Sequence, residues 1–373
     1  MTTPVRYHSG GFPPATLDWA RLIPLIGPAN AAVARYDGLL NAIPNAAVLL
    51  SPLMTQEAVL SSRIEGTQAT MGEVLEFEAE SDQAGMAEEK RSDIEEILNY
   101  RKALRRAEEL LKELPLCQRV VKEAHATLLE GVRGHNKTPG EYRRIPNWIG
   151  PPGCAIEEAR YVPVSADALP EAMSAWERYI HADAQDRLVQ LGVLHAEFEA
   201  LHPFLDGNGR LGRMLVPLFM ARNGLLQSPM FYISAFFERN REEYYERLLA
   251  VSRDGKWTEW VAFFLKSVIE QASENQSKAQ AIRGLYDDTL HRIADLTHSQ
   301  YAVHAAEFLF RSPIFKASDF YREPSLTPAS GRRILNLLQE SGFFREVRPS
   351  SGRRPAIFAF KQLLNLAEGR EVF

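Results

Sequence analysis

The chain has 373 residues, of which 45% are hydrophobic and 24% are charged, a composition typical of a soluble globular protein with more than one domain. The net charge of -5 gives no general reason to expect a nucleic-acid coat or a membrane surface. The charge is uneven, however. From Ser299 onward there are 11 Lys and Arg against 7 Asp and Glu, so this part is basic while the remainder is acidic.

Cysteine usage and hydropathy narrow the class of protein further. Cys117 and Cys154 are the only cysteines; they are too few for a disulfide framework and lack the spacing of metal ligands. Plain thiols of this kind are typical of a reducing cytosol. The first residues contain no apolar stretch like that of a signal peptide, and no apolar run is long enough to span a bilayer. We therefore expect a cytoplasmic protein with no membrane partner.

The first half of the chain is predicted to be helical. About twenty residues rich in Pro and Gly predict an irregular N-terminal arm. From Leu17 to about Leu114, apolar residues recur every three or four positions, which predicts helices. A second helical block begins near Leu116. We expect residues 1–115 to form an arm with a helical extension, and residues 116–270 to form a core.

The helical pattern is interrupted by a segment rich in Gly and Pro. It contains two short β-like pieces, RIPNWIG and ARYVPV, around a Gly/Pro turn. These pieces predict an exposed hairpin from Asn147 to Val164. Helices then resume on both sides of the segment HPFLDGNGRLGRML, and a helix with a polar end, at about residues 271–298, is predicted to connect the core to the tail.

The tail, residues 299–373, predicts a winged helix in an otherwise mainly α protein. Three short helices precede REVRPSSGRRPAIFAF, which predicts two strands joined by a turn. Thr327 and Pro328 are expected to cap the third helix, and Gly342 to end it. A winged helix contacts DNA or protein or mediates a homodimer. Six arginines on the third helix and the wing would suit phosphate contacts: Arg332, Arg333, Arg345, Arg348, Arg353 and Arg354.

The glycine-rich segment from His202 to Leu215 holds the best candidate site. DGNG alone would indicate a hairpin turn, but the flanking apolar residues have helical spacing, so the glycines lie between two helices. The free amides and dipole of the second helix favour a bound anion. Arg210 and Arg213 would lie on one helix face beside it. Asp206 could hold Mg²⁺ on phosphates, and His202 could accept a proton.

The segment has other interpretations. It could be a structural turn with surface arginines. His195, Glu199 and His202 could share one helix face as a metal trio, but the HExxH order is absent and Pro203 tends to end the helix. A P-loop is excluded because GxxxxGK[ST] does not occur in the sequence.

The segment His202-Pro-Phe-Leu-Asp206-Gly207-Asn208-Gly209-Arg210-Leu-Gly-Arg213 resembles the complete signature of the Fic family, HxFx(D/E)GNGRxxR. The resemblance implies a protein adenylyltransferase that moves AMP from ATP to a Ser, Thr or Tyr hydroxyl of a target protein. It would make His202 the general base and Asp206 the Mg²⁺ ligand. It would place Gly207, Asn208 and Gly209 around the phosphates as an anion hole, with Arg210 and Arg213 beside them. The family's phosphotransferase branch has a lysine in place of Gly209.

The resemblance also covers the segments around the signature. Tyr244 aligns with a tyrosine that contacts the nucleotide in the family, although helix packing is an alternative role for it. The predicted hairpin would be the family's flap, which pins a target segment by strand addition. An ordinary surface loop is the alternative, and exposure of Trp148 and Tyr161 would favour the flap. The residues expected at the flap site are Ile149, Gly150, Tyr161 and Val162.

A second motif, in LSSRIEGTQA, resembles the family's inhibitory motif (S/T)xxxE(G/N) through Ser61, Glu65 and Gly66. The resemblance implies that Glu65 pairs with Arg213 and so makes ATP bind unproductively. Ser61 would steady the inhibitory helix. An Arg–carboxylate pair is well suited to this role because it can be bidentate. The same glutamate could instead position water for the removal of AMP.

Two hypotheses for the function, from different classes, therefore remain open. One is a self-inhibited adenylyltransferase, using ATP and Mg²⁺, with the winged helix as a targeting module. The other is a DNA-binding transcriptional regulator whose core senses a nucleotide.

Overall fold

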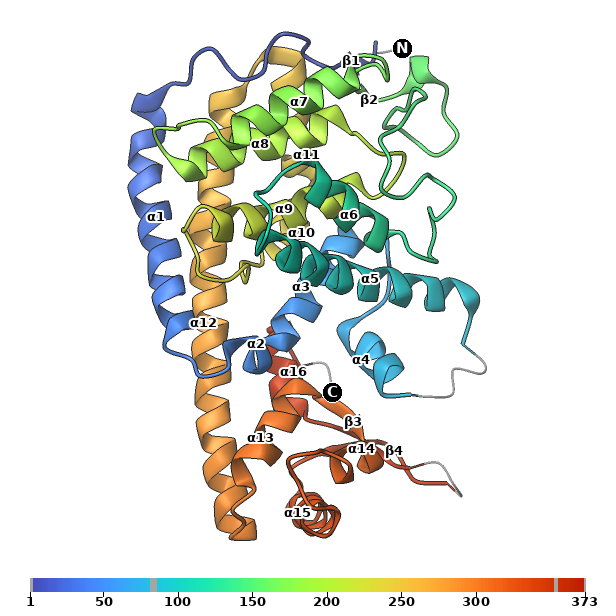
Figure 1. Cartoon of the computed structure of the whole chain (residues 1–373), viewed down its shortest axis with the longest axis vertical. Coiled ribbons are helices and arrows are strands. Elements are labelled where there is room, and N and C mark those ends of the chain that lie inside the picture. Colours follow the sequence, from blue (N-terminus) through green and yellow to red (C-terminus); the bar gives the residue numbers. More distant parts are fainter. Residues whose placement is uncertain (1–2, 81–85, 352–354, 372–373) are drawn as a thin grey trace. The chain divides into compact units, whose positions relative to one another are not determined.

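The computed structural model of the chain describes residues 3–80, 86–351 and 355–371. Most of these residues are helical and the strands are short, so the prediction of a mainly α protein is confirmed (Figure 1). The chain forms two compact units. The first comprises Met1–Asp37, Leu60–Thr67 and Leu98–Ser273, and the second comprises Gly38–Val59, Gln68–Ile97 and Glu274–Phe373.

The first unit contains most of the helices. Its elements are β1 (Val5–Arg6), most of α1 (Trp19–Asn41), the end of α3 (Ser51–Ile64), the later part of α5 (Glu88–Leu111), α6 (Gln118–Leu128), a 3₁₀ turn (Ile156–Glu158), β2 (Tyr161–Val162), α7 (Leu169–Ile180), α8 (Arg187–Leu201), α9 (Asn208–Arg222), α10 (Ser234–Arg239), α11 (Arg241–Asp254) and the first part of α12 (Trp257–Thr297).

Helix α8 lies at the centre of the first unit. Nearly all of its residues are buried, and it packs against α7, α9 and α11. The side chain of Asp186 caps its start by accepting the Val189 N–H. At Gly192 a Cβ atom would lie 3.1 Å from the Phe264 ring, so a glycine lets α12 approach closely. The helix ends where His202, in the left-handed region, precedes Pro203.

The N-terminal arm is mostly irregular, as predicted, but it contains a strand that the sequence pattern did not indicate. Val5 and Arg6 form β1, which runs parallel to β2 with Val5 opposite Tyr161 (Figure 1). The Tyr7 hydroxyl then donates to Glu197 Oε1 at 2.6 Å. The arm is therefore held in the first unit by a backbone pairing and by a buried carboxylate.

The predicted hairpin from Asn147 to Val164 is not formed as a regular two-stranded ribbon. The two pieces meet at one antiparallel bridge, between Ile149 and Tyr161. Because β2 pairs with β1 on its other side, Tyr161 has backbone neighbours on both edges. Tyr161 is only 7% exposed, whereas Trp148 is 41% exposed, so one of the two aromatic residues meets the condition that would favour the flap.

The second unit contains a small sheet and short helices. Its elements are α2 (Ala46–Leu49), the start of α3, α4 (Met71–Ala79), the start of α5, the later part of α12, α13 (Ala302–Arg311), β3 (Ile314–Lys316), α14 (Ala317–Tyr321), α15 (Pro328–Glu340), β4 (Arg345–Arg348), β5 (Ile357–Ala359) and α16 (Lys361–Glu368).

The tail contains the three helices and two strands required by the winged-helix prediction. Thr327 caps α15 by accepting the Ser330 N–H, and Gly342 follows its end in the left-handed region, both as expected. The antiparallel sheet has the order β3-β5-β4. The sequence pattern did not indicate β3, which is only three residues long, or α16.

Candidate functional site

The turn between α8 and α9 has an unusual backbone. His202 and Gly207 both have positive φ angles, of 46° and 75°. At Gly207, the N-cap of α9, a glycine takes this conformation without the strain that another residue would incur. At His202 the same region costs energy, so its conformation depends on the contacts that surround it.

Two side chains hold the loop from inside. Asn208 Oδ1 accepts the Phe204 N–H and Asn208 Nδ2 donates to the Phe204 carbonyl, both at 2.9 Å. His125 Nδ1 accepts the Gly140 N–H, which leaves Nε2 to donate to the Asp206 carbonyl at 3.0 Å. The side chain of Asn208 is therefore committed to the loop, and only its backbone is left to form an anion hole.

The start of α9 leaves backbone donors open. No side chain caps the helix, and its first recorded backbone bond runs from the Leu211 N–H to the Gly207 carbonyl. The amides of Asn208 and Gly209 precede that bond, and the first amides of a helix have no partner within it. Together with the helix dipole, such amides favour a bound anion, so the anion-binding site stays a prediction.

His202 lies beside these amides. Burial lowers its pKa to about 4, and the charge of Arg143 acts in the same direction, while the charges of Glu65 and Asp206 oppose it. The imidazole is therefore neutral at pH 7 and able to accept a proton.

Arg213 is completely buried and contacts the predicted inhibitory motif. Its Nη2 donates to Glu65 Oε1 at 2.7 Å and to the Ser61 carbonyl at 2.8 Å, and its Nε donates to Ser61 Oγ at 3.0 Å. Burial alone would lower the pKa of Arg213, but the charge of Glu65 and those of neighbouring acidic groups together outweigh burial, and the pKa is raised. Burial likewise opposes ionisation of Glu65, and the charge of Arg213 lowers its pKa. The structure thus contains the predicted ion pair.

The glycine at position 209 makes this ion pair sterically feasible. A Cβ atom there would lie 2.2 Å from Glu65 Oε1, a distance at which atoms overlap. Any larger residue, including the lysine of the phosphotransferase branch, would displace Glu65. The Gly66 backbone, with a φ angle of 105°, ends the helical turn directly after this glutamate.

Asp206 and Arg210 lie at the other end of the turn. Asp206 Oδ1 accepts the Gly207 N–H at 2.6 Å and is 3.6 Å from Arg210 Nη2. Arg210 is 2% exposed. Gly134 leaves space beside the second carboxylate oxygen, because a Cβ atom there would lie 3.0 Å from Asp206 Oδ2.

A pocket of about 630 Å³ is lined by some of these groups, but its lining does not include Asp206, Gly207, Asn208 or Arg210. Its lining includes Glu65, His202, Gly209 and Arg213, and on another wall Trp148, Ile149, Gly150 and Tyr161 from the predicted flap site. Val162, also expected at the flap site, is 8% exposed, and the pocket lining does not include it. The pocket is large enough for a nucleotide.

Tyr244 does not lie in this pocket, contrary to the nucleotide-contacting role expected for it. It is 0% exposed, and its hydroxyl is 2.9 Å from His195 Nε2. The next residue on α11, Tyr245, lines the pocket together with Arg241. The packing role applies to Tyr244, and the sequence pattern did not indicate that its neighbour Tyr245 lines the pocket.

The metal trio is not assembled. His195 Nε2 faces the Tyr244 hydroxyl and is 3.9 Å from Glu199 Oε1, and no cluster of three metal-ligating side chains occurs among the described residues. Burial raises the pKa of Glu199 to about 7, although the charge of Arg213 opposes this. A carboxyl that is half protonated near neutrality is a poor metal ligand.

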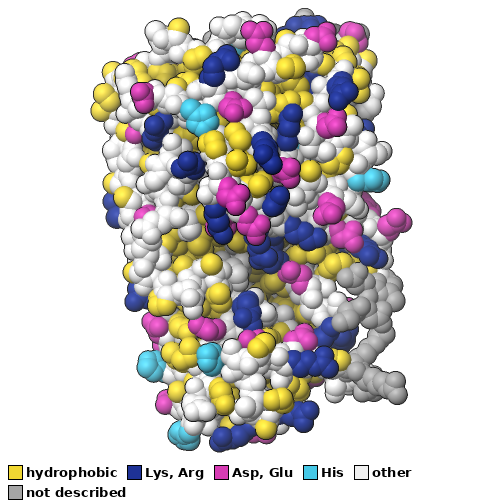
Figure 2. Space-filling model, viewed as in Figure 1, with side chains coloured by type: hydrophobic (Ala, Val, Ile, Leu, Met, Phe, Trp, Pro, Cys, Tyr) yellow, Lys and Arg dark blue, Asp and Glu magenta, His cyan; other side chains and the backbone are white. Residues whose placement is uncertain are grey.

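The basic residues of the second unit are only partly available for a ligand. Arg348 forms an ion pair with Glu80, and the Arg332 guanidinium lies 5.6 Å from the centre of the Tyr321 ring. Arg333 and Arg345 are exposed. Arg353 and Arg354 lie outside the described residues. On the face drawn in Figure 2, basic and acidic side chains are interspersed.

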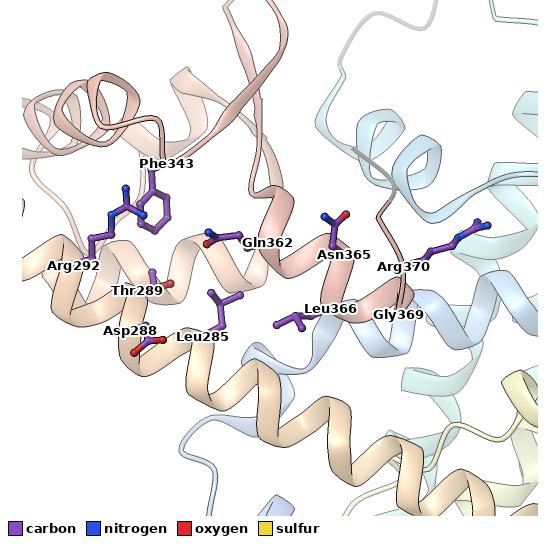
Figure 3. A pocket seen from close by; sticks show the side chains of 10 residues that line it. All are labelled: Leu285, Asp288, Thr289, Arg292, Phe343, Gln362, Asn365, Leu366, Gly369 and Arg370. Atoms are coloured by element: carbon purple, nitrogen blue, oxygen red, sulfur yellow. The ribbon is translucent and has the colours of Figure 1, made fainter.

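The second unit also has a hollow of its own, of about 740 Å³, between α12 and α16 (Figure 3). Leu285 and Leu366 line its apolar part, and Asp288, Arg292 and Arg370 line its rim. The Arg292 guanidinium lies 4.9 Å from the centre of the Phe343 ring. None of the predicted site residues lies in this hollow.

Comparisons with known proteins agree with this geometry. The sequence matches the Fic/DOC family over residues 115–220 and the Fic/DOC family N-terminal region over residues 23–109. A probable protein adenylyltransferase of Aquifex aeolicus is 46% identical over 56 residues, which are 15% of this chain and 15% of that protein. The fold and the site define a mainly helical protein with a helix N-terminus at a pocket.

Solved structures show the same fold. A Fic family protein from Desulfovibrio desulfuricans aligns with a TM-score of 0.60 at 19% identity, over 93% of this chain and 98% of that chain. A Fic-domain signalling protein from Bacteroides thetaiotaomicron aligns with a TM-score of 0.51 at 19% identity, over 70% of this chain and 97% of that chain. The chain belongs to the Fic/DOC family. No helix among its described residues is long and apolar enough to cross a membrane.

Proposed function

We propose that this protein is an adenylyltransferase that transfers AMP from ATP to a hydroxyl group of target proteins and of itself, and that Glu65 inhibits it. One observation carries the proposal: His202, whose imidazole is neutral at pH 7, Gly209 at the start of α9 and Arg213 all line one pocket. Such a site suits phosphoryl-type transfer, which depends mostly on positioning and charge neutralisation.

The proposed reaction assigns a step to each group. The target hydroxyl gives its proton to the His202 imidazole as its oxygen attacks the α-phosphorus of ATP. The bond from that phosphorus to the oxygen bridging the β-phosphate breaks, and pyrophosphate leaves. The amides of Asn208 and Gly209 bind phosphate oxygens, and Arg210 and Arg213 neutralise the charge of the phosphates.

Asp206 would hold Mg²⁺ on the phosphates. The fit is supported by its second carboxylate oxygen, beside which Gly134 leaves space. Mg²⁺ commonly uses one or two carboxylates together with waters and substrate phosphates, so a single aspartate is sufficient. The cation would neutralise charge on the departing pyrophosphate.

Inhibition follows from the same arginine. With Arg213 bound to Ser61 and Glu65, its guanidinium is not free for the outer phosphates of ATP, and the Glu65 carboxylate would repel them. Removal of AMP by the same pocket, with Glu65 positioning water, is a further role for this residue.

The proposed domains are residues 1–115, 116–270, 271–298 and 299–373, the last acting as a winged-helix targeting module.

The test compares ATP labelled at the α-phosphate with ATP labelled at the γ-phosphate. We expect Glu65→Gly to incorporate the α label into protein in the presence of Mg²⁺, and Glu65→Gly combined with His202→Ala to incorporate none. Incorporation of the γ label would instead establish phosphotransfer. Absence of both labels, with a nucleotide-dependent shift of DNA in electrophoresis, would support the regulator instead.

A further inference from the structure

Arg143 precedes the flap segment and is 2% exposed, yet its guanidinium contacts main-chain carbonyl groups instead of an acidic partner in its recorded hydrogen bonds. Its Nε donates to the His202 carbonyl at 3.0 Å and its Nη2 to the Leu201 carbonyl at 3.3 Å. It also donates to the carbonyls of Val164, through Nη2, and of Ile145, through Nη1 at 3.5 Å.

These carbonyls belong to three different places in the chain. Leu201 and His202 are the end of α8, whose last carbonyl groups have no partner within the helix and carry the negative end of its dipole. Ile145 lies just before the flap segment, residues 147–164, and Val164 is the last residue of that segment. In addition, the Arg143 N–H donates to the Pro203 carbonyl at 2.9 Å. One cationic side chain therefore ties both ends of the flap segment to the end of α8.

The conformation of His202 depends on contacts of this kind. Its φ angle of 46° lies in a region that a non-glycine residue adopts only when its surroundings compensate the strain. Asn147 adds to the contacts of Arg143, since its Nδ2 donates to the Phe204 carbonyl at 3.2 Å and lies 3.5 Å from the His202 carbonyl. The carbonyl of His202 is thus held from two directions.

We propose that Arg143 is a positioning residue that fixes the His202 imidazole and the flap segment relative to one another, with Asn147 as its auxiliary. The inference rests on the proposed function of this site. A guanidinium suits the task because its donors form a rigid planar fork that reaches several acceptors at once, whereas an ammonium group is a single point on a flexible stem. Arg143 does not line the pocket, so it acts through His202 and the flap and not on the nucleotide.

The experiment uses the full chain carrying Glu65→Gly as the active background. Into it we introduce Arg143→Lys, Arg143→Met and Asn147→Ala, with Arg144→Lys as the matched control, because Arg144 is exposed and pairs with Glu141 at 3.1 Å. Initial rates of α-label transfer, the Kd for ATP and the melting temperature are measured for each variant.

We expect Arg143→Lys to lower kcat by about 10- to 100-fold, since a misplacement of about 1 Å can cost that much, while the Kd for ATP stays within about twofold. Asn147→Ala should lower kcat by a smaller factor at an unchanged melting temperature. Arg144→Lys should change neither kcat nor the melting temperature. If Arg143→Met does not fold, Arg143→Lys and Asn147→Ala decide the question.

The inference is overturned if folded Arg143→Lys transfers AMP as fast as the background, or if its loss of rate is matched by a loss of ATP binding. If the Glu65→Gly background itself transfers no label, the proposed function fails. The inference is then tested by the NMR shifts of the His202 ring nitrogens, which should change in Arg143→Lys and not in Arg144→Lys.

Discussion

Arg213 brings together the anion site and the inhibitory motif. It lies in the second turn of α9, near the positive end of the helix dipole, and it is buried completely. Such a residue requires a compensating anion. Glu65 supplies one in this structure, and the phosphates of ATP would supply another. Competition between these two anions for one guanidinium is the physical basis of the proposed inhibition.

Ser61 contributes to that inhibition through two hydrogen bonds to Arg213, one from its hydroxyl and one from its carbonyl. We expect Ser61→Ala to remove only the first and to raise the transfer rate by about three- to tenfold, which corresponds to about 0.5–1.5 kcal/mol. Ser62→Ala is the matched control, because Ser62 is equally buried and has no recorded hydroxyl partner. Equal rates in the two variants would argue against a role for Ser61.

The pKa of His202 sets the pH dependence of transfer. A general base works when it is neutral, so the rate rises with pH through the pKa of His202, which burial lowers to about 4. The Glu65 charge raises this pKa, so its removal in Glu65→Gly would not shift the fall in rate to a higher pH. A pH–rate profile of Glu65→Gly should therefore be flat from about pH 5.5 to 8. A fall in rate below about pH 6.5, the ordinary range of histidine, would contradict this environment.

At the scale of elements, helix α11 places two neighbouring tyrosines in different surroundings. Tyr245 lines the pocket, whereas Tyr244 is buried against His195. We expect Tyr245→Ala to weaken ATP binding by about 1–3 kcal/mol if it stacks on the base, and Tyr244→Phe to lower stability by about 1 kcal/mol without affecting ATP binding. Calorimetric titration and thermal unfolding measure the two effects. The reverse pattern would restore the original assignment of Tyr244.

The helical parts of the site could be predicted from the sequence, because they depend on local pattern. The turn between α8 and α9 follows from apolar spacing on both sides of the glycines, and the motif that begins at Ser61 is a short continuous segment at the end of α3. The flap could not be predicted in the same way. Whether Tyr161 is exposed depends on β1, more than 150 residues earlier in the chain, and a two-residue strand leaves no periodic signal.

The role of Arg143 also exceeds what a sequence pattern can show. It follows Tyr142 in an ordinary polar segment, and its acceptors are main-chain carbonyls of residues 145, 164, 201 and 202, which no side-chain pattern encodes. The only available signal was an arginine pair directly before the β-like piece RIPNWIG. Likewise, adjacent residues on a helix point about 100° apart, so only the packing of α11 distinguishes Tyr244 from Tyr245.

At the scale of the whole molecule, the groups of the proposed mechanism belong to the first unit, including the inhibitory segment Leu60–Thr67. The exposed arginines Arg332 and Arg333 belong to the second unit, on α15. We expect Arg332→Glu combined with Arg333→Glu to leave the transfer rate of Glu65→Gly within about twofold, because surface substitutions rarely change stability much. Any electrophoretic shift of DNA should weaken in the same variant. Loss of transfer would contradict this separation of roles.

The central claim is that Glu65 restrains an adenylyltransferase by holding Arg213. The most direct test is the initial rate of α-label incorporation at saturating ATP and Mg²⁺, measured for the wild-type chain and for Glu65→Gly. Loss of a buried charge-assisted contact of about 1.5–3 kcal/mol predicts that Glu65→Gly is faster by about 10- to 100-fold. Equal rates in the two proteins, with both folded and both binding ATP, would contradict the account.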